Sequence, residues 1–590
     1  MKNNIRTFFL FFITSVFFTI SLSAQEALKS IEEEYYEFLS LNGIVERPTL
    51  GYRTLSDSVW VFNEVESFEE NEDGTFTKVR VDGRDSSSNI WKNNNLGTRY
   101  TLWQAANPVD NWFMRGINQG LIARVYGPEW FNSYNTASPY GQNDGALWQG
   151  RGYNTALTTG IRLEGYGFEL TFKPQVSWSQ NREFDYIKPA YSGENFKNKA
   201  DTYGYYGVPS IDAPQRFGDS SFWTYDWGDT EVRWSWKSFT TGFGTQAIWL
   251  GPAKLNPIIH SNNAPAYPKF DIGLRKTKLT MPHFGWDLGD IEARAWWGKL
   301  SESDWFDNDD GNDNNLISGL SISYEFPGIF KGFSIGCNRT MLSKWDDISS
   351  YSLFKIYNPL LSSGNSGGKD ANDQRISFIF DYYLNKAGFE IYLEWARNDY
   401  SPTKDYYVRY PFHTQGWTFG SRKEFNLPFG LKGQILLELT NLECSADYDR
   451  LLSWYSTFYA HHIISQGYTN KGQWLGAGTG TGGNSQYLSL SVFHKTGSIT
   501  LFAQRRNPDL DYSYFIDSKN TTTNTETNIR ATLDFGLDCT QYFMKNIMLN
   551  GNIVFVQEHN PLNISKNNGE SNDSEKRYNF HFTLLIGYRF

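Results

Sequence analysis

Connections of alternating length are the feature that most constrains how this chain folds. From about Gln119 onward, strand-like stretches are joined in turn by tight Gly-bearing turns and by long polar or aromatic insertions. The tight turns are EGYG (164–167), PGIFKG (327–332), NKAG (385–388), LPFG (427–430) and KTGS (495–498). The long insertions cover about residues 133–152, 181–228, 251–269, 303–314, 343–373, 399–413, 444–485, 508–526 and 559–575. Bacterial outer-membrane barrels have short periplasmic turns and long outer loops, so the pattern predicts an all-β transmembrane barrel of about 18 antiparallel strands.

Individual strands of this pattern have one apolar and one polar face. In the segment 578–590, the even-numbered residues are all aromatic or aliphatic, while the odd-numbered residues include Asn579, His581, Thr583 and Arg589. A period of two places these sets on opposite faces of a strand, as in a soluble sandwich or a membrane barrel. A Lys or Arg that faces lipid at mid-depth costs about 2–4 kcal/mol, so a stable barrel requires this separation. A closed ring also removes the unpaired edges that lipid does not tolerate.

The composition agrees with a wide barrel. The chain has 590 residues, of which 39% are hydrophobic and 17% aromatic, a balance that a polar lumen and aromatic girdles at both membrane interfaces would produce. A multidomain soluble β protein stays open as an alternative. The net charge of −10 argues against a nucleic-acid-binding protein. Cys337, Cys444 and Cys539 are odd in number and far apart, and they suggest neither a disulfide framework nor a metal site.

The N-terminal residues predict export and a small separate region. Residues 1–24 combine basic residues, a short apolar stretch and a small-residue end, which is typical of a cleaved signal peptide. Residues 25–98 are predicted to be a periplasmic helical region, with one helix ending near Gly43 and a possible second one in LSDSVWVFNEVESFEE (55–70). Residues 99–590 would then form the barrel, with long extracellular loops. No later segment approaches the roughly 20 apolar residues of a spanning helix.

Several stretches of the chain resemble the Wzi family of capsule assembly proteins. The most specific is GFGTQAIWLGPAKLNPIIHSNNAPAYPKF (242–270). The others are NDGALWQGRGYN (143–154), GFELTFKPQVSWSQNREF (167–184), IDAPQRFGD (211–219), FYAHHIISQGYTNKGQWLG (458–476) and the lead-in YYEFLSLNGIVERP (35–48). The resemblance implies an outer-membrane lectin that holds capsular polysaccharide at the cell surface, with a periplasmic helical bundle and no catalysis. Resemblance to other outer-membrane proteins also implies that barrel-insertion machinery reads the final aromatic strand.

Aromatic rings and amides in the long connections are the candidates for sugar binding. A flat ring covers the apolar face of a sugar, while nearby Asn, Asp and Arg bind its hydroxyl groups. The candidate ligand-binding residues are Trp148, Arg151, Trp223, Trp227, Trp249, Asn256, His260, Asn262, Asn263, His461 and His462. For the tryptophans, the alternative is an interface girdle or packing inside the barrel.

Two of these groups have a structural interpretation that we favour. Trp249–Pro268 contains four prolines, and a rigid loop of this kind is better explained as a plug inside the lumen than as a ligand loop. His461 and His462 are adjacent and would point to opposite faces of a strand. Together with His260 they are therefore better explained as buried, hydrogen-bonded side chains than as a metal or acid–base site.

The predicted function is noncovalent binding of capsular or other surface polysaccharide at the outer membrane. The expected partners are this polysaccharide, outer-membrane lipid and the insertion machinery. We predict no catalytic residue, cofactor, metal or nucleic-acid partner. Two alternatives stay open: a general diffusion porin with the same barrel, and an envelope enzyme that acts on glycans or lipids. Carboxylates such as Glu390, Glu394 and Asp534 keep the enzyme alternative open, although nothing marks a particular acid–base pair.

Overall fold

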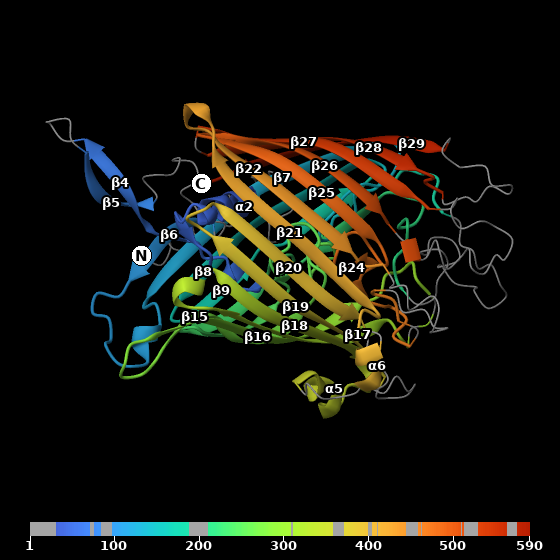
Figure 1. Cartoon of the computed structure of the whole chain (residues 1–590). Coiled ribbons are helices and arrows are strands. Elements are labelled where there is room, and N and C mark those ends of the chain that lie inside the picture. Colours follow the sequence, from blue (N-terminus) through green and yellow to red (C-terminus); the bar gives the residue numbers. More distant parts are fainter. Residues whose placement is uncertain are drawn as a thin grey trace, which may run out of the picture.

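The described residues form a closed antiparallel β-barrel (Figure 1). The computed structural model describes residues 31–70, 76–83, 97–187, 211–307, 309, 311–357, 371–398, 404–409, 411–443, 458–461, 463–508, 510–511, 529–544, 546–562 and 575–590. One end of the barrel carries the short turns and the labels N and C, and we call it the turn end. The opposite end, where the long connections leave the strands, is the loop end.

The ring contains 18 antiparallel strands, which confirms the predicted fold class. Two of these are interrupted, because β9 with β10 and β11 with β12 each occupy one place in the ring. Pairing of β29 with β7 closes it, with Phe582 opposite Tyr134. The strands of the ring are β7 (Gly120–Asn135), β8 (Gly152–Gly165), β9 (Phe168–Phe172), β10 (Gln175–Ser179), β11 (Phe222–Asp226), β12 (Glu231–Trp236), β13 (Phe239–Gly244), β15 (Lys269–Thr280), β16 (Asp287–Ser301), β17 (Asn314–Glu325), β18 (Phe333–Lys344), β19 (Asn372–Leu384), β20 (Phe389–Asn398), β21 (Gln415–Asn426), β22 (Lys432–Asn441), β25 (Asn484–His494), β26 (Gly497–Asn507), β27 (Ala531–Phe543), β28 (Ile547–His559) and β29 (Lys576–Tyr588).

The barrel wall is apolar on its outer face and polar on its inner face. In β29, Phe580 is 44% exposed and Phe582 is 41% exposed, whereas the intervening polar His581 is 4% exposed and Asn579 is fully buried. A soluble sandwich would bury the aromatic face and expose the polar one. This inverted arrangement is what a strand between lipid and a polar lumen requires, and it decides between the two fold alternatives that the sequence left open.

The segment before the ring enters the lumen at the turn end. Helix α2 (Ile31–Leu41) lies inside the barrel, where Phe38 stacks on Phe493 of β25 with 4.1 Å between ring centroids. Two small sheets follow, in which β1 (Val45–Glu46) pairs with β3 (Val61–Phe62) and β2 (Tyr52–Arg53) pairs with β14 (Trp249–Leu250). The N-terminal segment is therefore packed against the barrel interior.

The second predicted helix is wrong. Within residues 55–70, only Leu55–Asp57 form a 3₁₀ turn, and Glu64–Glu70 is strand β4, paired with β5 (Phe76–Asp82). The alternation of acidic residues with Val65 and Ser67 suits a hairpin, in which Val65 lies opposite the β-branched Val81. The region boundary 25–98, its periplasmic position and the signal peptide stay predictions, since residues 1–30 lie outside the described part of the chain.

Buried ion pairs tie the N-terminal segment to the lumen wall. Glu37 of α2 pairs with Arg53 at 3.0 Å and with Arg422 of β21 at 3.1 Å. Arg47 pairs with Glu390 of β20 at 2.7 Å. Burying a charge is costly unless it is paired, so these partners fix how the segment sits in the lumen.

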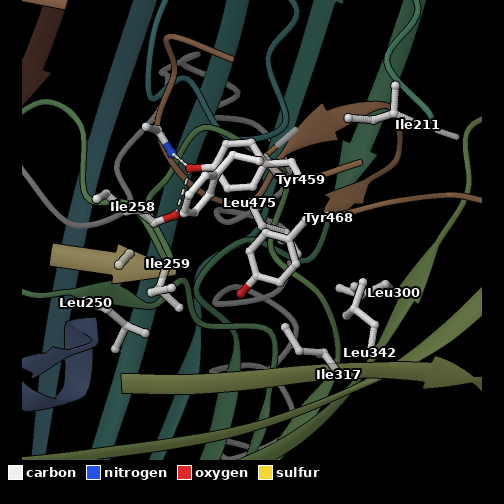
Figure 2. Packing of buried hydrophobic residues seen from close by; sticks show 14 of the residues in the cluster. Ile211, Leu250, Ile258, Ile259, Leu300, Ile317, Leu342, Tyr459, Tyr468 and Leu475 are labelled. Atoms are coloured by element: carbon white, nitrogen blue, oxygen red, sulfur yellow. Dashed lines mark hydrogen bonds between the residues drawn. The ribbon is translucent and has the colours of Figure 1, made fainter. Parts of the chain in front are cut away.

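Two connections from the loop end fold inward and form a plug. The plug consists of residues 245–268, between β13 and β15, and of residues 458–461 and 463–483, between β22 and β25. Figure 2 shows plug residues Ile258, Ile259, Tyr459 and Leu475 packed beside Ile317 and Leu342 of the barrel strands. The Tyr459 hydroxyl donates to the Ile258 carbonyl and accepts from the Ala477 N–H, both at 2.8 Å. The structure thus confirms the plug interpretation of Trp249–Pro268.

Inward-facing glutamates hold the plug by its backbone. Glu438 of β22 accepts a hydrogen bond from the N–H of Asn256 at 2.8 Å, and Glu394 of β20 accepts one from the N–H of Ile258 at 2.8 Å. A proline-rich loop has few internal hydrogen bonds, and its buried N–H groups need such partners. These carboxylates therefore have a structural role.

The remaining described elements lie outside the ring or within loops. Helix α5 (Ser350–Phe354) packs on the outer wall, where Trp297 of β16 donates to the Leu353 carbonyl at 2.9 Å. Among the described residues, no helix is long and apolar enough to cross a membrane. The other short elements are β6 (Thr98–Gln104), β23 (Thr469–Asn470), β24 (Gln473–Trp474), α6 (Lys404–Arg409) and 3₁₀ turns at Met114–Gly116, Gly328–Phe330, Trp345–Asp347, Lys355–Tyr357 and Pro428–Gly430.

Candidate functional site

A cavity of about 280 Å³ opens above the plug at the loop end of the barrel. We call it the cup. Residues of six connections and of the four consecutive strands β26 to β29 line it. The lining side chains used below are Tyr140, Trp148, Phe184, Tyr186, Trp474, Arg506, Thr532, Glu558 and Arg577. A smaller cavity of about 160 Å³, the lower pocket, adjoins the cup and shares Tyr140, Trp148, Asn263, Gln473 and Arg506 with it.

Aromatic side chains from three connections meet at the cup. Trp148 lies against Phe217 with 4.9 Å between ring centroids, and Phe184 contacts Tyr186 edge-on at 5.8 Å. Trp474 comes from the plug, where its hairpin strand β24 presents it. Phe184 is buried, whereas Trp148, Tyr186 and Trp474 are partly exposed, and partly exposed rings can cover the apolar face of a sugar.

Arginines from the barrel wall bring charge to the same cavity. Arg506 of β26 donates to Asp534 at 2.8 Å, and its guanidinium lies 5.2 Å from the centroid of the Tyr140 ring. Arg577 of β29 donates to Glu558 of β28 at 2.9 Å. A guanidinium has five donors in a planar fork, so each of these side chains keeps donors for hydroxyl or carboxylate oxygens of a ligand.

The plug positions the loop that carries Trp148. The Gly145 N–H donates to the Asn262 carbonyl at 2.8 Å, and the side chain of Gln142 donates to Oδ1 of Asn256 at 2.6 Å. At the base of this loop, the side-chain amide of Asn135 donates to the Gln149 carbonyl at 2.9 Å. Asn256 and Asn262 therefore support the cup from below.

The structure places only two of the predicted ligand-binding residues on the cup. These are Trp148 and Asn263, both of which also line the lower pocket. Arg151 lies at the rim of the wall, where it donates to the backbone carbonyls of Thr136 at 3.1 Å and Glu183 at 2.5 Å. Trp249 is buried within the plug. The assignment of these four residues to a ligand stays a prediction.

The predicted histidines are structural where they are described. His260 is buried, with Nδ1 3.1 Å from the Ser261 carbonyl and Nε2 3.1 Å from the Tyr267 hydroxyl. Burial, together with the nearby Lys269 charge, lowers the pKa of His260 to about 3, so the imidazole is neutral. His461 is also buried, and its Nδ1 accepts from the backbone N–H of Ile464 at 3.0 Å. His462 lies outside the described residues.

Trp223 and Trp227 lie on the barrel wall, which corrects their placement in a long connection, while their role in ligand binding stays a prediction. Trp223 lies in β11, opposite Trp178 of β10, and is 60% exposed on the outer wall. Trp227 follows β11 directly and is 65% exposed. This short strand was not predicted because it lies within the long, mostly polar stretch 181–228. Exposed tryptophans on the lipid-facing side of a barrel are typical of an interface girdle.

The carboxylates that kept the enzyme alternative open are already engaged. Glu390 pairs with Arg47, Glu394 holds the Ile258 N–H, and Asp534 accepts from Arg506. In the described ranges, no group of three or more His, Cys, Asp or Glu residues is arranged to hold a metal ion.

Comparison with solved structures gives a clear likeness in fold. The carbohydrate-binding β-barrel Wzi of Escherichia coli, an outer-membrane protein involved in group 1 capsule assembly, aligns over 79% of this chain and 85% of its own, with a TM-score of 0.51 and 12% identity. The fold is that of Wzi. OccAB2 of Acinetobacter baumannii (79% of this chain, 98% of its own, 9% identity) and OccD1, also called OprD (83% and 99%, 8% identity), align with a TM-score of 0.37 each. No family model and no curated protein sequence matches the chain.

Four of the stretches quoted in the sequence analysis contribute residues to the cup, beside the wall strands β26 to β29. Residues 143–154 carry Trp148, 211–219 carry Pro214, 242–270 carry Asn263 and 458–476 carry Trp474. The Wzi likeness at 12% identity concerns the fold. The structure of this chain itself brings residues of these four stretches together at the loop end of the barrel.

Sequence reasoning missed the wall residues of the cup. Arg506, Thr532, Glu558 and Arg577 lie on strands, close to their loop ends, and were not among the candidates. The alternation of outward and inward side chains along each strand would have identified them. In β27, for example, Phe535 is exposed on the outer face, so Thr532 falls on the inner face.

Proposed function

We propose that this protein is an outer-membrane barrel that binds surface polysaccharide in the cup without catalysis. The observation that carries the proposal is the cup itself, in which partly exposed aromatic rings face arginine and carboxylate side chains above a closed plug. Sugars are recognised by this combination of ring stacking and fixed hydrogen-bonding groups. The likeness in fold to a carbohydrate-binding barrel supports the same function.

The filled lumen favours a binding protein over the porin alternative. Plug residues Ile258, Tyr459 and Leu475 are fully or almost fully buried at the centre of the barrel, and α2 occupies the turn end. A diffusion channel needs a continuous aqueous path. In planar bilayers we therefore expect the purified barrel to show no steady porin-like conductance, and a large stable conductance would contradict the sealed-lumen view.

Glycan binding by the detergent-solubilised barrel tests the proposal. Polysaccharide extracted from the organism's own envelope would be titrated into the wild type and into Trp148→Ala and Trp474→Ala by calorimetry. Loss of one stacking ring is expected to cost roughly 0.5–1.5 kcal/mol, which raises Kd about two- to tenfold.

The matched control is the pair Trp223→Ala and Trp227→Ala on the outer wall. These substitutions remove the same kind of side chain from the lipid-facing surface, so Kd for the polysaccharide should not change. Absence of binding by the wild type, or equal losses in cup and wall variants, would overturn the proposal.

A further inference from the structure

We propose that the connection between β6 and β7 anchors the barrel by inserting an aromatic tip among the phospholipid headgroups at the turn end. The residues concerned are 109–116, which we call the anchor loop. Short turns of outer-membrane barrels face the periplasm, so the leaflet involved is the periplasmic one. The inference concerns how the barrel sits in its membrane, and it does not depend on glycan binding.

Hydrogen bonds give the anchor loop a fixed shape against the wall. Residues Met114–Gly116 form a 3₁₀ turn. The indole N–H of Trp236 donates to the Phe113 carbonyl at 2.9 Å, and the backbone N–H of Lys237 donates to the Gly116 carbonyl at 3.1 Å. Because Trp236 ends β12 and Lys237 follows it, the loop is attached to the barrel at this strand and its side chains keep defined positions.

The anchor loop lies on the outer, lipid-facing side of the wall. In β12, Arg233 points into the lumen, where it pairs with Asp271 at 2.6 Å. Side chains alternate along a strand, so Trp234 and Trp236 point outward. The ring of Phe113 stacks on these two indoles, with 6.4 and 6.1 Å between ring centroids. A loop that served only to close the lumen would pack on the inner face instead.

The exposed apolar surface of the anchor loop continues that of the barrel wall. Trp112 is 70% exposed. On the adjoining outer face, Val232 of β12 is 56% exposed, and Phe168 of β9, which lies opposite Trp234, is 50% exposed. A large exposed apolar patch marks a surface that a partner or a membrane covers, and here the neighbouring wall already faces lipid. This continuity favours the membrane over a periplasmic protein as the occupant.

A lysine beside the exposed rings suits the phosphate of a phospholipid. The Lys237 ammonium lies 4.8 Å from the ring centroid of Trp236 and 5.5 Å from that of Trp112. In the described part of the chain, no carboxylate pairs with this ammonium. Indole rings are enriched at membrane interfaces, and a lysine can place its apolar stem there while its charge reaches the headgroups. Phosphate is therefore the anion that we expect Lys237 to bind.

Depth-dependent quenching of a fluorophore on the anchor loop tests the inference. In a background with Cys337→Ala, Cys444→Ala and Cys539→Ala, Trp112→Cys would be labelled with NBD and reconstituted into vesicles of phosphatidylcholine and phosphatidylglycerol. An interfacial group sits about 5–10 Å into the boundary between headgroups and acyl chains. A nitroxide on the headgroup should therefore quench this fluorophore about twofold more strongly than one near the end of the acyl chain, and aqueous iodide should quench it weakly.

Two exposed apolar positions provide matched controls for depth. Leu537 lies at the middle of β27 and is exposed on the outer face, so a fluorophore at Leu537→Cys should be quenched most by the acyl-chain nitroxide. Val61 is also exposed, but it lines the cavity between the N-terminal segment and the wall at the turn end. A fluorophore at Val61→Cys should be quenched by iodide and by neither nitroxide.

The contribution of Lys237 is measured with the same fluorophore at position 112. Nitroxide-labelled phosphatidylglycerol and phosphatidylcholine would be compared as quenchers. One lysine near the lipid surface should enrich anionic phosphatidylglycerol about fivefold at the anchor loop, and Lys237→Gln should abolish this enrichment. Lys423→Gln is the control, because Lys423 is an exposed lysine at the turn end of β21, remote from β12 in the ring, and the enrichment should persist.

The outcomes decide the inference for variants that still show the heat-modifiable migration of a folded barrel. Headgroup quenching at position 112, with loss of the phosphatidylglycerol preference only in Lys237→Gln, supports it. A fluorophore at position 112 that behaves like the one at position 61 would overturn it and make the patch a surface for a soluble protein. Equal enrichment in Lys237→Gln and Lys423→Gln would overturn the assignment of the phosphate to Lys237.

Discussion

Arginine–carboxylate pairs occur both in the lumen at the turn end and in the cup, but they are buried to different degrees. Near the turn end, Arg422 is 3% exposed and lies between Glu37 and Glu390. In the cup, Arg577 is 20% exposed and pairs with Glu558. A deeply buried guanidinium is fully committed to its partners, whereas a half-open one can exchange water for a ligand. Burial therefore separates the charges that hold the fold from those available for binding.

Among the substitutions predicted here, that of Arg422 should lower the free energy of unfolding most. Arg422→Leu removes one cationic partner from each of the buried carboxylates Glu37 and Glu390. Breaking a buried pair on one side typically costs about 3–5 kcal/mol. We expect the free energy of unfolding in urea, followed by tryptophan fluorescence, to fall by about this amount.

The control for this variant restores charge balance. In the double variant Arg422→Leu and Glu390→Gln, part of the loss should be recovered, because one cation and one carboxylate are removed together and an amide costs less to bury than an unpaired carboxylate. Equal instability of the single and double variants would show that packing of the Arg422 stem, and not its charge, stabilises the lumen at the turn end.

Lowering the pH should reduce the free energy of unfolding by an intermediate amount. The group responsible is His260 of the plug, which lies between the turn end of the lumen and the cup. The pKa of His260 is about 3 in the folded protein, below its ordinary value of 6.5, because the side chain is buried and Lys269 lies nearby. The neutral imidazole contributes its full stability above pH 6.5, and this contribution is lost as the pH falls toward 3. At pH 5 the loss is about 2 kcal/mol.

The variant His260→Asn isolates this contribution from the other titrating groups. The wild type should lose about 2 kcal/mol more than the variant between pH 7 and pH 5, measured as the free energy of unfolding in urea. Parallel curves for the two proteins would mean that His260 is solvated or already protonated, and would place the plug in a looser state than the structure describes.

The barrel itself could be predicted from the sequence because its wall repeats a local rule. Alternation along each strand and short turns such as NKAG (385–388) are signals within a few residues. Strand β4 was not predicted, because a short acidic hairpin has no strong apolar period. Strand β11 was not predicted, because it has only five residues and lies within a long polar stretch.

The cup could be predicted only in part because it is assembled from distant segments. Trp148 and Asn263 were found by residue type and by their position in long connections, yet Trp223 has the same chemistry and lies on the outer wall. Which tryptophan faces a cavity depends on how the plug folds back into the lumen. That choice depends on contacts such as the one between Glu438 and the Asn256 N–H, which join residues 182 positions apart.

The smallest change in stability is expected for Arg577, and it sharpens the contrast with Arg422. In Arg577→Gln, Glu558 still accepts a hydrogen bond from Ser138, and the lost pair is partly exposed. Pairs of this kind contribute about 1 kcal/mol or less, so the urea midpoint should hardly move. The glycan, however, loses a charged donor, and its Kd should rise about tenfold by calorimetry. A variant with reduced stability and unchanged glycan affinity would reverse the assignment and make Arg577 a structural residue like Arg422.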